Sequence, residues 1–153
     1  SFLGLAQCDP VGNINVSRFG TKVAGCGGFI DISQNVKNMV FCGTFTAKGL
    51  KTHVEDGKLV IDQEGSDQKF KRSLQQITFS GTVAAQSNKN ILFVTERAVL
   101  KLTREGLVVT EIAPGIDLER DVLGQMEFRP LIAPDLKQMD PRIFADSPMG
   151  LQF

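Results

Sequence analysis

A glycine-rich turn, Gly25-Cys26-Gly27-Gly28, carries the clearest chemical character in the sequence. It precedes Phe29, Ile32 and Val36, which recur at helical spacing, so we expect the glycines to lead into a short helix. Glycine lets the backbone approach a ligand closely, and N–H groups at a helix start carry partial positive charge. Such a turn can hold a phosphate or a developing oxyanion. A tight turn packed on a sheet explains it equally well, because it matches neither the GxGxxG pattern nor a P-loop.

Charged side chains near predicted strands are further candidates. Lys48 lies just past an apolar run, residues 38–45, that predicts a strand buried on both faces of a parallel sheet. Ligands bind at the carboxyl ends of strands in open sheets, and a cation there suits a phosphate, although a solvated loop lysine fits the sequence as well. Asp31 could cap or orient the glycine turn. Glu96 is expected to be held by its neighbour Arg97 rather than to act in catalysis.

The histidine and the cysteines do not have the pattern of a metal site. His53, the only histidine, lies beside a predicted hairpin turn and is expected on the surface rather than as a catalytic base. Cys8, Cys26 and Cys42 are widely spaced and lack the paired ligands of a structural zinc site. We therefore expect three reduced, mostly buried cysteines and no bound metal.

Length and charge narrow the class of protein. The 153 residues are enough for one domain with its own core. Seventeen Lys and Arg residues balance seventeen Asp and Glu residues, which argues against a basic nucleic-acid surface and against a polybasic membrane anchor. The sequence has no apolar run of 18 residues, and its first ten residues do not have the pattern of a signal peptide. A cytoplasmic protein is the expectation.

The remaining patterns predict mainly strands and hairpins. Hairpins are expected for residues 2–6 with 13–19, 52–54 with 59–61 and 98–103 with 107–112, strands at 76–81 and 90–95, and an exposed charged stretch at 62–72. Asp117 is expected to cap a short helix, Leu118 to Met126. The chain thus divides into residues 1–50 with the glycine turn and sheet, 51–112 with the hairpins, and 113–153 with the helix and an extended tail along the surface or a neighbouring subunit.

Four segments, in order, together resemble one family. Residues 25–35, GCGGFIDISQN, resemble the GxGG segment of class I coenzyme A transferases, and residues 40–49, VFCGTFTAKG, resemble the strand and loop that follow it. Residues 94–99, VTERAV, resemble the family's TE[RK]AVF segment, and residues 111–122, EIAPGIDLERDV, its EIAPGIDLERDIL stretch. The resemblance is to the fused acetate- and propionate-type acyl-CoA:acetate transferases.

This resemblance implies an α/β fold, the C-terminal portion of the second open-sheet domain of a CoA-transferase, with added β-hairpins. It implies transfer of CoA from an acyl-CoA to acetate or a similar short carboxylate through a glutamyl-CoA thioester. The family's glutamate lies in an E-x-G motif before the glycine segment, so we expect it upstream of Ser1 and expect this chain alone to be inactive. Glu55-Asp56-Gly57 matches that motif by letters only.

The resemblance also assigns supporting roles. The Gly27-Gly28 turn matches the family's backbone donor to the thioester oxyanion, with Gly28 favoured, and Lys48 matches a lysine that approaches the CoA phosphates. Coenzyme A is then a substrate, and no further cofactor is expected. The expected partners are the acyl-CoA, a short carboxylate, the N-terminal part of the same transferase and further copies of it, but neither nucleic acid nor a membrane.

Two alternatives stay open at this point. The glycine turn could bind an acyl-CoA or a nucleotide in a module that has no covalent chemistry. It could instead be purely structural in an assembly domain whose proline-rich tail packs on another subunit. Binding of CoA by the isolated chain would favour the first of these alternatives.

Overall fold

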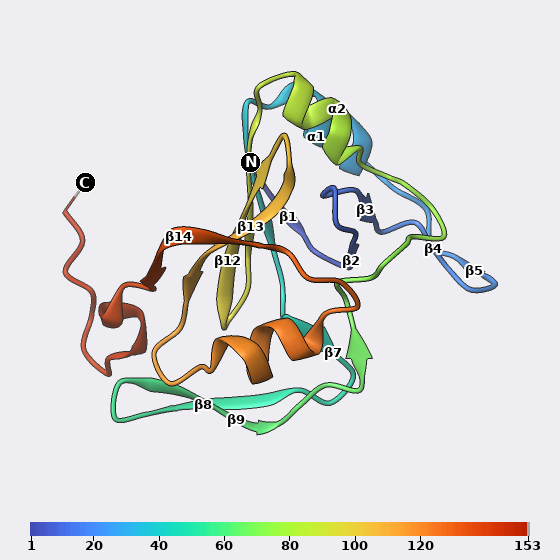
Figure 1. The fold of residues 1–153 in the computed structure, drawn as a ribbon. Helices are drawn as coiled ribbons and strands as arrows, with labels where there is room; N and C mark the ends of the chain where they lie inside the picture. The colour runs from blue at the N-terminus through green and yellow to red at the C-terminus, as the bar shows by residue number, and fades with distance from the viewer. Residues whose placement is uncertain (153) are drawn as a thin grey trace.

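A six-stranded mixed sheet forms the centre of the protein in the computed structural model, which describes residues 1–152 (Figure 1). Its strands, in spatial order, are β1 (Phe2–Gly4), β6 (Asn38–Cys42), β11 (Asn90–Val94), β12 (Ala98–Thr103), β13 (Gly106–Ile112) and β14 (Leu131–Gln138). The first three strands run parallel, β12 is antiparallel to both of its neighbours, and β14 is parallel to β13. The predicted α/β class is therefore confirmed.

Two short helices lie together at one end of the sheet (Figure 1). They are α1 (Phe29–Asn35) and α2 (Gly81–Gln86), and the Lys89 Nζ joins them by donating to the carbonyl oxygen of Ser33 at 3.0 Å. The ring of Phe41 on β6 lies at the centre of the core beneath them. Its centroid is 5.8 Å from that of Phe29, 5.1 Å from Phe79 and 5.5 Å from Phe93. None of the helices in residues 1–152 is long and apolar enough to cross a membrane.

Small two-stranded pairs surround the sheet. They are β2 (Gln7–Cys8) with β3 (Ile14–Asn15), β4 (Arg18–Phe19) with β5 (Lys22–Val23), β7 (Thr46–Ala47) with β10 (Asp67–Gln68), and β8 (Lys51–Glu55) with β9 (Lys58–Gln63). Three helical turns complete the described chain: η1 (Leu118–Val122) is a π-helical turn, whereas η2 (Leu123–Gln125) and η3 (Pro141–Phe144) are 3-10 turns. In Figure 1 the long β8–β9 hairpin runs along η1 and η2, and the Leu59 amide donates to the Pro114 carbonyl at 2.8 Å.

Local turn chemistry predicted several elements correctly. The Asp56-Gly57 pair has φ values of 51° and 73°, the left-handed geometry that a two-residue hairpin turn requires, and it joins β8 to β9 as expected. The helix after the glycine turn, the strand at 90–94 and the hairpin of β12 with β13 are also present. Asp117 caps its helical segment as predicted, because its side chain accepts from the Arg120 amide at 2.7 Å.

Long-range pairing overturned other expectations. Residues 2–4 do not join a hairpin but pair in parallel with β6, and the hairpin that follows is limited to β2 and β3. The predicted strand at 76–81 is wrong, since Gly81 begins α2 with Ser80 as its cap. The extended tail contains β14, which pairs with β13. The segment 118–126 is helical, but as a π turn followed by a 3-10 turn.

Two predictions of exposure were also wrong. The strand at 38–45 is not buried on both faces, because Met39 and Phe41 point into the core while Cys42 on the other face is exposed. The stretch 62–72 is not generally exposed, because Lys69 and Phe70 are buried within it. Because this stretch was expected to be exposed, the sequence did not indicate that part of the candidate site lies in it.

Candidate functional site

A buried ion-pair network lies where β11 ends at the carboxyl edge of the parallel strands. The Arg97 side chain is 0% exposed, and its guanidinium contacts two carboxylates. Its Nε donates to Glu96 Oε1 at 2.7 Å, while its Nη1 and Nη2 donate to the two oxygens of Glu64 at 2.6 and 3.0 Å. Two carboxylates around one guanidinium, one of them held by a two-point contact, make a rigid charged junction. The expectation that Arg97 holds Glu96 is thereby confirmed.

Aromatic rings pack directly on this junction. The Cζ atom of Arg97 lies 5.2 Å from the ring centroid of Phe45, within the range of a cation–π contact. The ring of Phe45 in turn lies 4.6 Å, centroid to centroid, from that of Phe70. All three side chains are buried. The apolar residues exclude water from the guanidinium, so its remaining polar contacts must come from the protein.

The turn η1 supplies one of those contacts. Arg97 Nη1 also donates to the main-chain oxygen of Asp121 at 3.0 Å, and the Ala113 amide donates to the main-chain oxygen of Arg97 at 2.8 Å. The Asp121 side chain accepts from the Asp117 amide at 2.9 Å and from the Arg120 guanidinium at 2.7 Å. The wide π turn thus leaves a carbonyl free that Arg97 satisfies.

The ionisation of the network follows from these contacts. Burial would raise the pKa of Glu64, but the hydrogen bonds from Arg97 and Thr46 and the positive charge of Arg97 hold it below its usual range. Burial would lower the pKa of Arg97, and the two glutamates more than compensate. Because the pKa of Glu64 is lower in the folded state, its ionisation stabilises the fold above about pH 4.5, and this stabilisation is lost as the pH falls through the lowered value.

Lys48 lies beyond β7 in a strained turn at the same edge of the sheet. Its φ is 60°, in the left-handed region that few residues other than glycine adopt, and Gly49 follows with a φ of 98°. The Lys48 side chain is 72% exposed and its Nζ lies 3.1 Å from a carboxylate oxygen of Asp67. Its carbonyl oxygen accepts from the Ser66 amide at 3.1 Å. The ammonium is thus accessible to a ligand.

The glycine turn leaves two backbone donors free. Gly25 and Gly27 have φ values of 77° and 52°, and Gly28 is the residue before α1. Gly27 and Gly28 are exposed, and neither of their amides donates to a main-chain or side-chain acceptor within residues 1–152. Figure 1 shows α1 at one end of the sheet and β7 at the other, so the structure does not bring this turn next to Lys48.

The other candidate residues lie outside this junction. Asp31 is exposed in the first turn of α1, and its carboxylate accepts no hydrogen bond from the described chain, so it does not orient the glycine turn here. His53 lies on the surface as predicted, where the hydrogen bond between its Nδ1 and the acceptor Asp62 Oδ2, 2.8 Å apart, raises its pKa. The expectation of mostly buried cysteines is wrong, because Cys8 is buried but Cys42 is exposed. Within residues 1–152 no group of acidic, histidine or cysteine side chains has the arrangement of a metal site.

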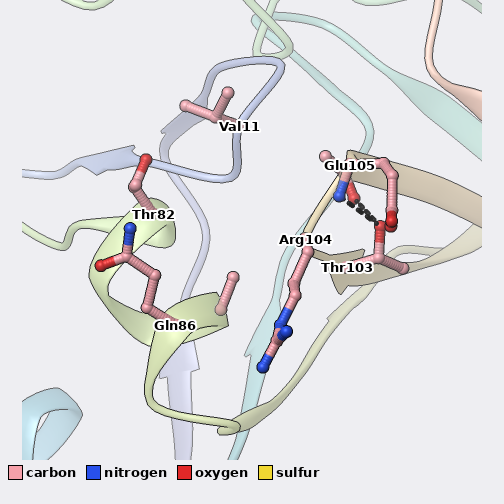
Figure 2. Close-up of a pocket in the computed structure, with 8 residues that line it drawn as sticks. Val11, Thr82, Gln86, Thr103, Arg104 and Glu105 are labelled. Atoms are coloured by element: carbon pink, nitrogen blue, oxygen red, sulfur yellow. Dashed lines mark hydrogen bonds between the residues drawn. The ribbon is translucent and has the colours of Figure 1, made fainter.

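Two surface hollows lie away from the glycine turn and Lys48. One of about 530 Å³ lies between α2 and the β12–β13 turn, and Figure 2 shows Thr82 and Gln86 on the helix facing Arg104 and Glu105 on the turn. The other, of about 460 Å³, lies between β9 and η1 and includes Glu64. Neither contains the glycine turn or Lys48.

Comparisons with known proteins show what the chain is similar to. The sequence matches no family model. It is 50% identical over 149 residues to the acetate CoA-transferase YdiF of Escherichia coli K12 and 49% identical over 154 residues to the caffeate CoA-transferase of Acetobacterium woodii. Each match covers 97% of this chain, which spans 28% and 29% of those two proteins.

Solved structures agree with the sequence matches. The crystal structure of the YdiF acyl-CoA transferase from E. coli O157:H7, as a thioester complex with CoA, superposes with a TM-score of 0.96 at 50% identity, covering 99% of this chain and 30% of that one. The chain is thus similar to CoA-transferases in both sequence and fold. The glutaconate CoA-transferase of Acidaminococcus fermentans, at 20% identity, shares the fold with a TM-score of 0.63 over 92% of this chain and 52% of its own.

The sequence did not indicate that Glu64 takes part in the junction. Glu64 lies in a run of charged residues, a pattern that predicts a solvent-exposed stretch. Two signals were present in that run: the isolated Phe70, and the Glu64-Gly65 pair. Any side chain at Gly65 would collide with the Ala47 carbonyl, so this glycine permits the close packing of the run on β7.

The buried junction predicts that Arg97→Met strongly destabilises the folded protein. The change leaves two carboxylates without their buried cation, and we expect it to lower the free energy of unfolding by about 3–5 kcal/mol. Arg129→Met is the matched control, because Arg129 pairs with Glu119 where both side chains are 67% exposed, and we expect almost no change in the free energy of unfolding. Urea unfolding of both variants measures the difference. Equal losses would contradict the buried junction.

Proposed function

We propose that this chain is part of an acyl-CoA:carboxylate CoA-transferase, which moves CoA from an acyl-CoA to acetate or a similar short carboxylate. The observation that carries the proposal is the 50% identity across 97% of the chain to an acetate CoA-transferase. The superposition on a relative that holds a CoA thioester supports it further. The chain spans less than a third of these relatives, so the proposal concerns the whole enzyme of which these residues form a segment.

The covalent steps require a carboxylate outside residues 1–153. In the proposed reaction a glutamate carboxylate attacks the thioester carbonyl, and the CoA thiolate leaves, which gives an acyl-glutamyl anhydride. The thiolate then attacks the glutamyl carbonyl and releases the acid, leaving CoA bound as a glutamyl thioester. Acetate reverses these two steps, so that the new acyl-CoA forms and the glutamate is restored.

This chain contributes backbone donors to those steps. The amides of Gly27 and Gly28 are exposed and have no acceptor in the described chain, so they are available to a thioester oxyanion. We assign the principal role to Gly28, which lies at the start of α1. Donors already oriented toward a developing negative charge lower the barrier without reorganisation.

Lys48 is proposed to contact the phosphates of CoA. Its exposed ammonium supports this role, and its left-handed backbone suggests a functional reason for a lysine at a position that suits glycine. The rest of the proposal is a cytoplasmic enzyme that binds its acyl-CoA and carboxylate substrates, needs no other cofactor, and assembles as a homo-oligomer. Residues 1–153 are proposed to form the C-terminal portion of its second open-sheet domain.

A covalent CoA adduct tests the proposed reaction. The full-length protein incubated with acetyl-CoA without a second carboxylate should gain the mass of CoA on one glutamate, and acetate should remove it. Intact-mass spectrometry followed by peptide mapping measures both events. Tight binding of acetyl-CoA with no covalent adduct and no transfer to labelled acetate would instead support a non-catalytic binding module.

A matched pair of substitutions tests the donor role of Gly28. Gly28→Pro removes its amide hydrogen, whereas Gly28→Ala keeps it and places a Cβ at an ordinary contact distance, 3.7 Å from Ile32 Cδ1. Gly28 has a φ of −82°, which proline tolerates. We expect Gly28→Pro to lower kcat by about 100-fold or more and Gly28→Ala by much less. Equal losses in steady-state assays would contradict the assignment.

A further inference from the structure

Three consecutive residues after β6, Thr44, Phe45 and Thr46, are each held by a different charged side chain. The Lys69 Nζ donates to the carbonyl oxygen of Thr44 at 2.8 Å. The amide of Phe45 donates to Glu96 Oε2 at 2.8 Å. The peptide group between Thr44 and Phe45 is therefore held at both its oxygen and its N–H.

The third contact is made by a hydroxyl. Thr46 is fully buried, and its Oγ1 donates to Glu64 Oε1. The same hydroxyl accepts from the Gly65 amide at 3.1 Å, so both of its hydrogen-bonding functions are used. Arg97 contacts both Glu96 and Glu64, so the contact at Phe45 and the contact at Thr46 are linked through its guanidinium.

The charges of this group balance. Arg97 and Lys69 supply two positive charges, and Glu64 and Glu96 supply two negative ones. Lys69 is only 9% exposed, and it passes so close to Gly43 that a Cβ there would lie 3.0 Å from Nζ. Burying a lysine ammonium costs free energy, which lowers its pKa, and the neighbouring Glu96 opposes that shift. Such a costly arrangement calls for a reason beyond chain packing.

We propose that Lys69, Glu96 and Glu64 form a positioning clamp that fixes the segment 44–46 and thereby the Lys48 turn. Lys48 follows the clamped segment after one residue, and its left-handed φ of 60° is retained only where the surrounding structure determines it. The inference rests on the proposed function, in which Lys48 contacts CoA. It assigns positioning roles, not catalytic ones, to three side chains that do not touch the substrate.

Thr46→Val and Thr46→Ser in the full-length protein test the clamp. Valine has nearly the shape of threonine but cannot bond to Glu64, whereas serine keeps the hydroxyl. Without ligand, we expect exchange of the Ser66 amide, which donates to the Lys48 carbonyl oxygen at 3.1 Å, to be about tenfold faster in Thr46→Val, the effect of one lost hydrogen bond, and close to wild type in Thr46→Ser. With acetyl-CoA, we expect the KM of Thr46→Val to rise about tenfold with kcat nearly unchanged, because ligand binding alone depends on Lys48.

Thr110→Val is the matched control. Thr110 also donates its hydroxyl, in this case to the main-chain oxygen of Val99 at 3.1 Å, but it lies on β13 away from the clamp. Exchange of the Ser66 amide that is unchanged in Thr46→Val, or equally faster in Thr110→Val, would overturn the proposal. If Thr46→Val does not fold, Glu64→Gln is measured instead, with faster exchange of this amide expected and unchanged exchange again overturning the clamp.

The two readouts separate this inference from the proposed function. Exchange is measured without CoA, so faster exchange of the Ser66 amide supports the clamp even if the wild-type protein transfers no CoA. Transfer of CoA by the wild type together with unchanged exchange in Thr46→Val would instead remove the clamp and leave the proposed function intact.

Discussion

The contact between the buried Arg97 guanidinium and its two glutamates organises this part of the fold. A charge removed from water is costly, so its partners must lie at fixed positions around it. Glu96 is its neighbour in sequence, but Glu64 is 33 residues away and the Asp121 carbonyl is 24 residues away. The packing of the hairpin region and of η1 against the sheet is therefore set by the geometry of one guanidinium.

This constraint connects two of the four segments that resemble CoA-transferases. Residues 94–99 contain Glu96 and Arg97, and residues 111–122 contain the carbonyl of Asp121 that Arg97 satisfies. The Ala113 amide also donates to the main-chain oxygen of Arg97. These two segments therefore pack against each other. The glycine turn and Lys48, in contrast, lie on loops at opposite ends of the sheet, and both are exposed.

Local patterns predicted the elements that local physics determines. Asp56-Gly57 forms its hairpin turn because both residues tolerate a positive φ, and the spacing of Phe29, Ile32 and Val36 indicated α1 correctly although Ile32 is 41% exposed. The pairing of Phe2–Gly4 with β6 could not be predicted, because a three-residue strand has no periodicity of its own. β14 was missed because Pro134 interrupts it, which an edge strand tolerates.

The residues of the candidate site also fall into those that the sequence indicated and those that it did not. Gly27, Gly28 and Lys48 were predicted because a glycine-rich turn and a lysine after a strand suit an anionic ligand, and their roles stay predictions. The burial of Glu64 and Lys69 could not be predicted, since a charged residue in a charged run carries no sign that it is buried. Only the tertiary contacts with Arg97 and Thr44 reveal their place. Burial of charge, rather than the presence of charge, separates these residues from their neighbours.

A double-mutant cycle between Arg97 and Glu64 tests the central claim most directly. Unfolding free energies are measured for the wild type, Arg97→Met, Glu64→Gln and the double variant. A direct buried contact predicts that the two single losses do not add, with an interaction energy of about 2 kcal/mol or more. An interaction energy below about 0.5 kcal/mol would show that the two residues act independently, and it would contradict the role given to Arg97.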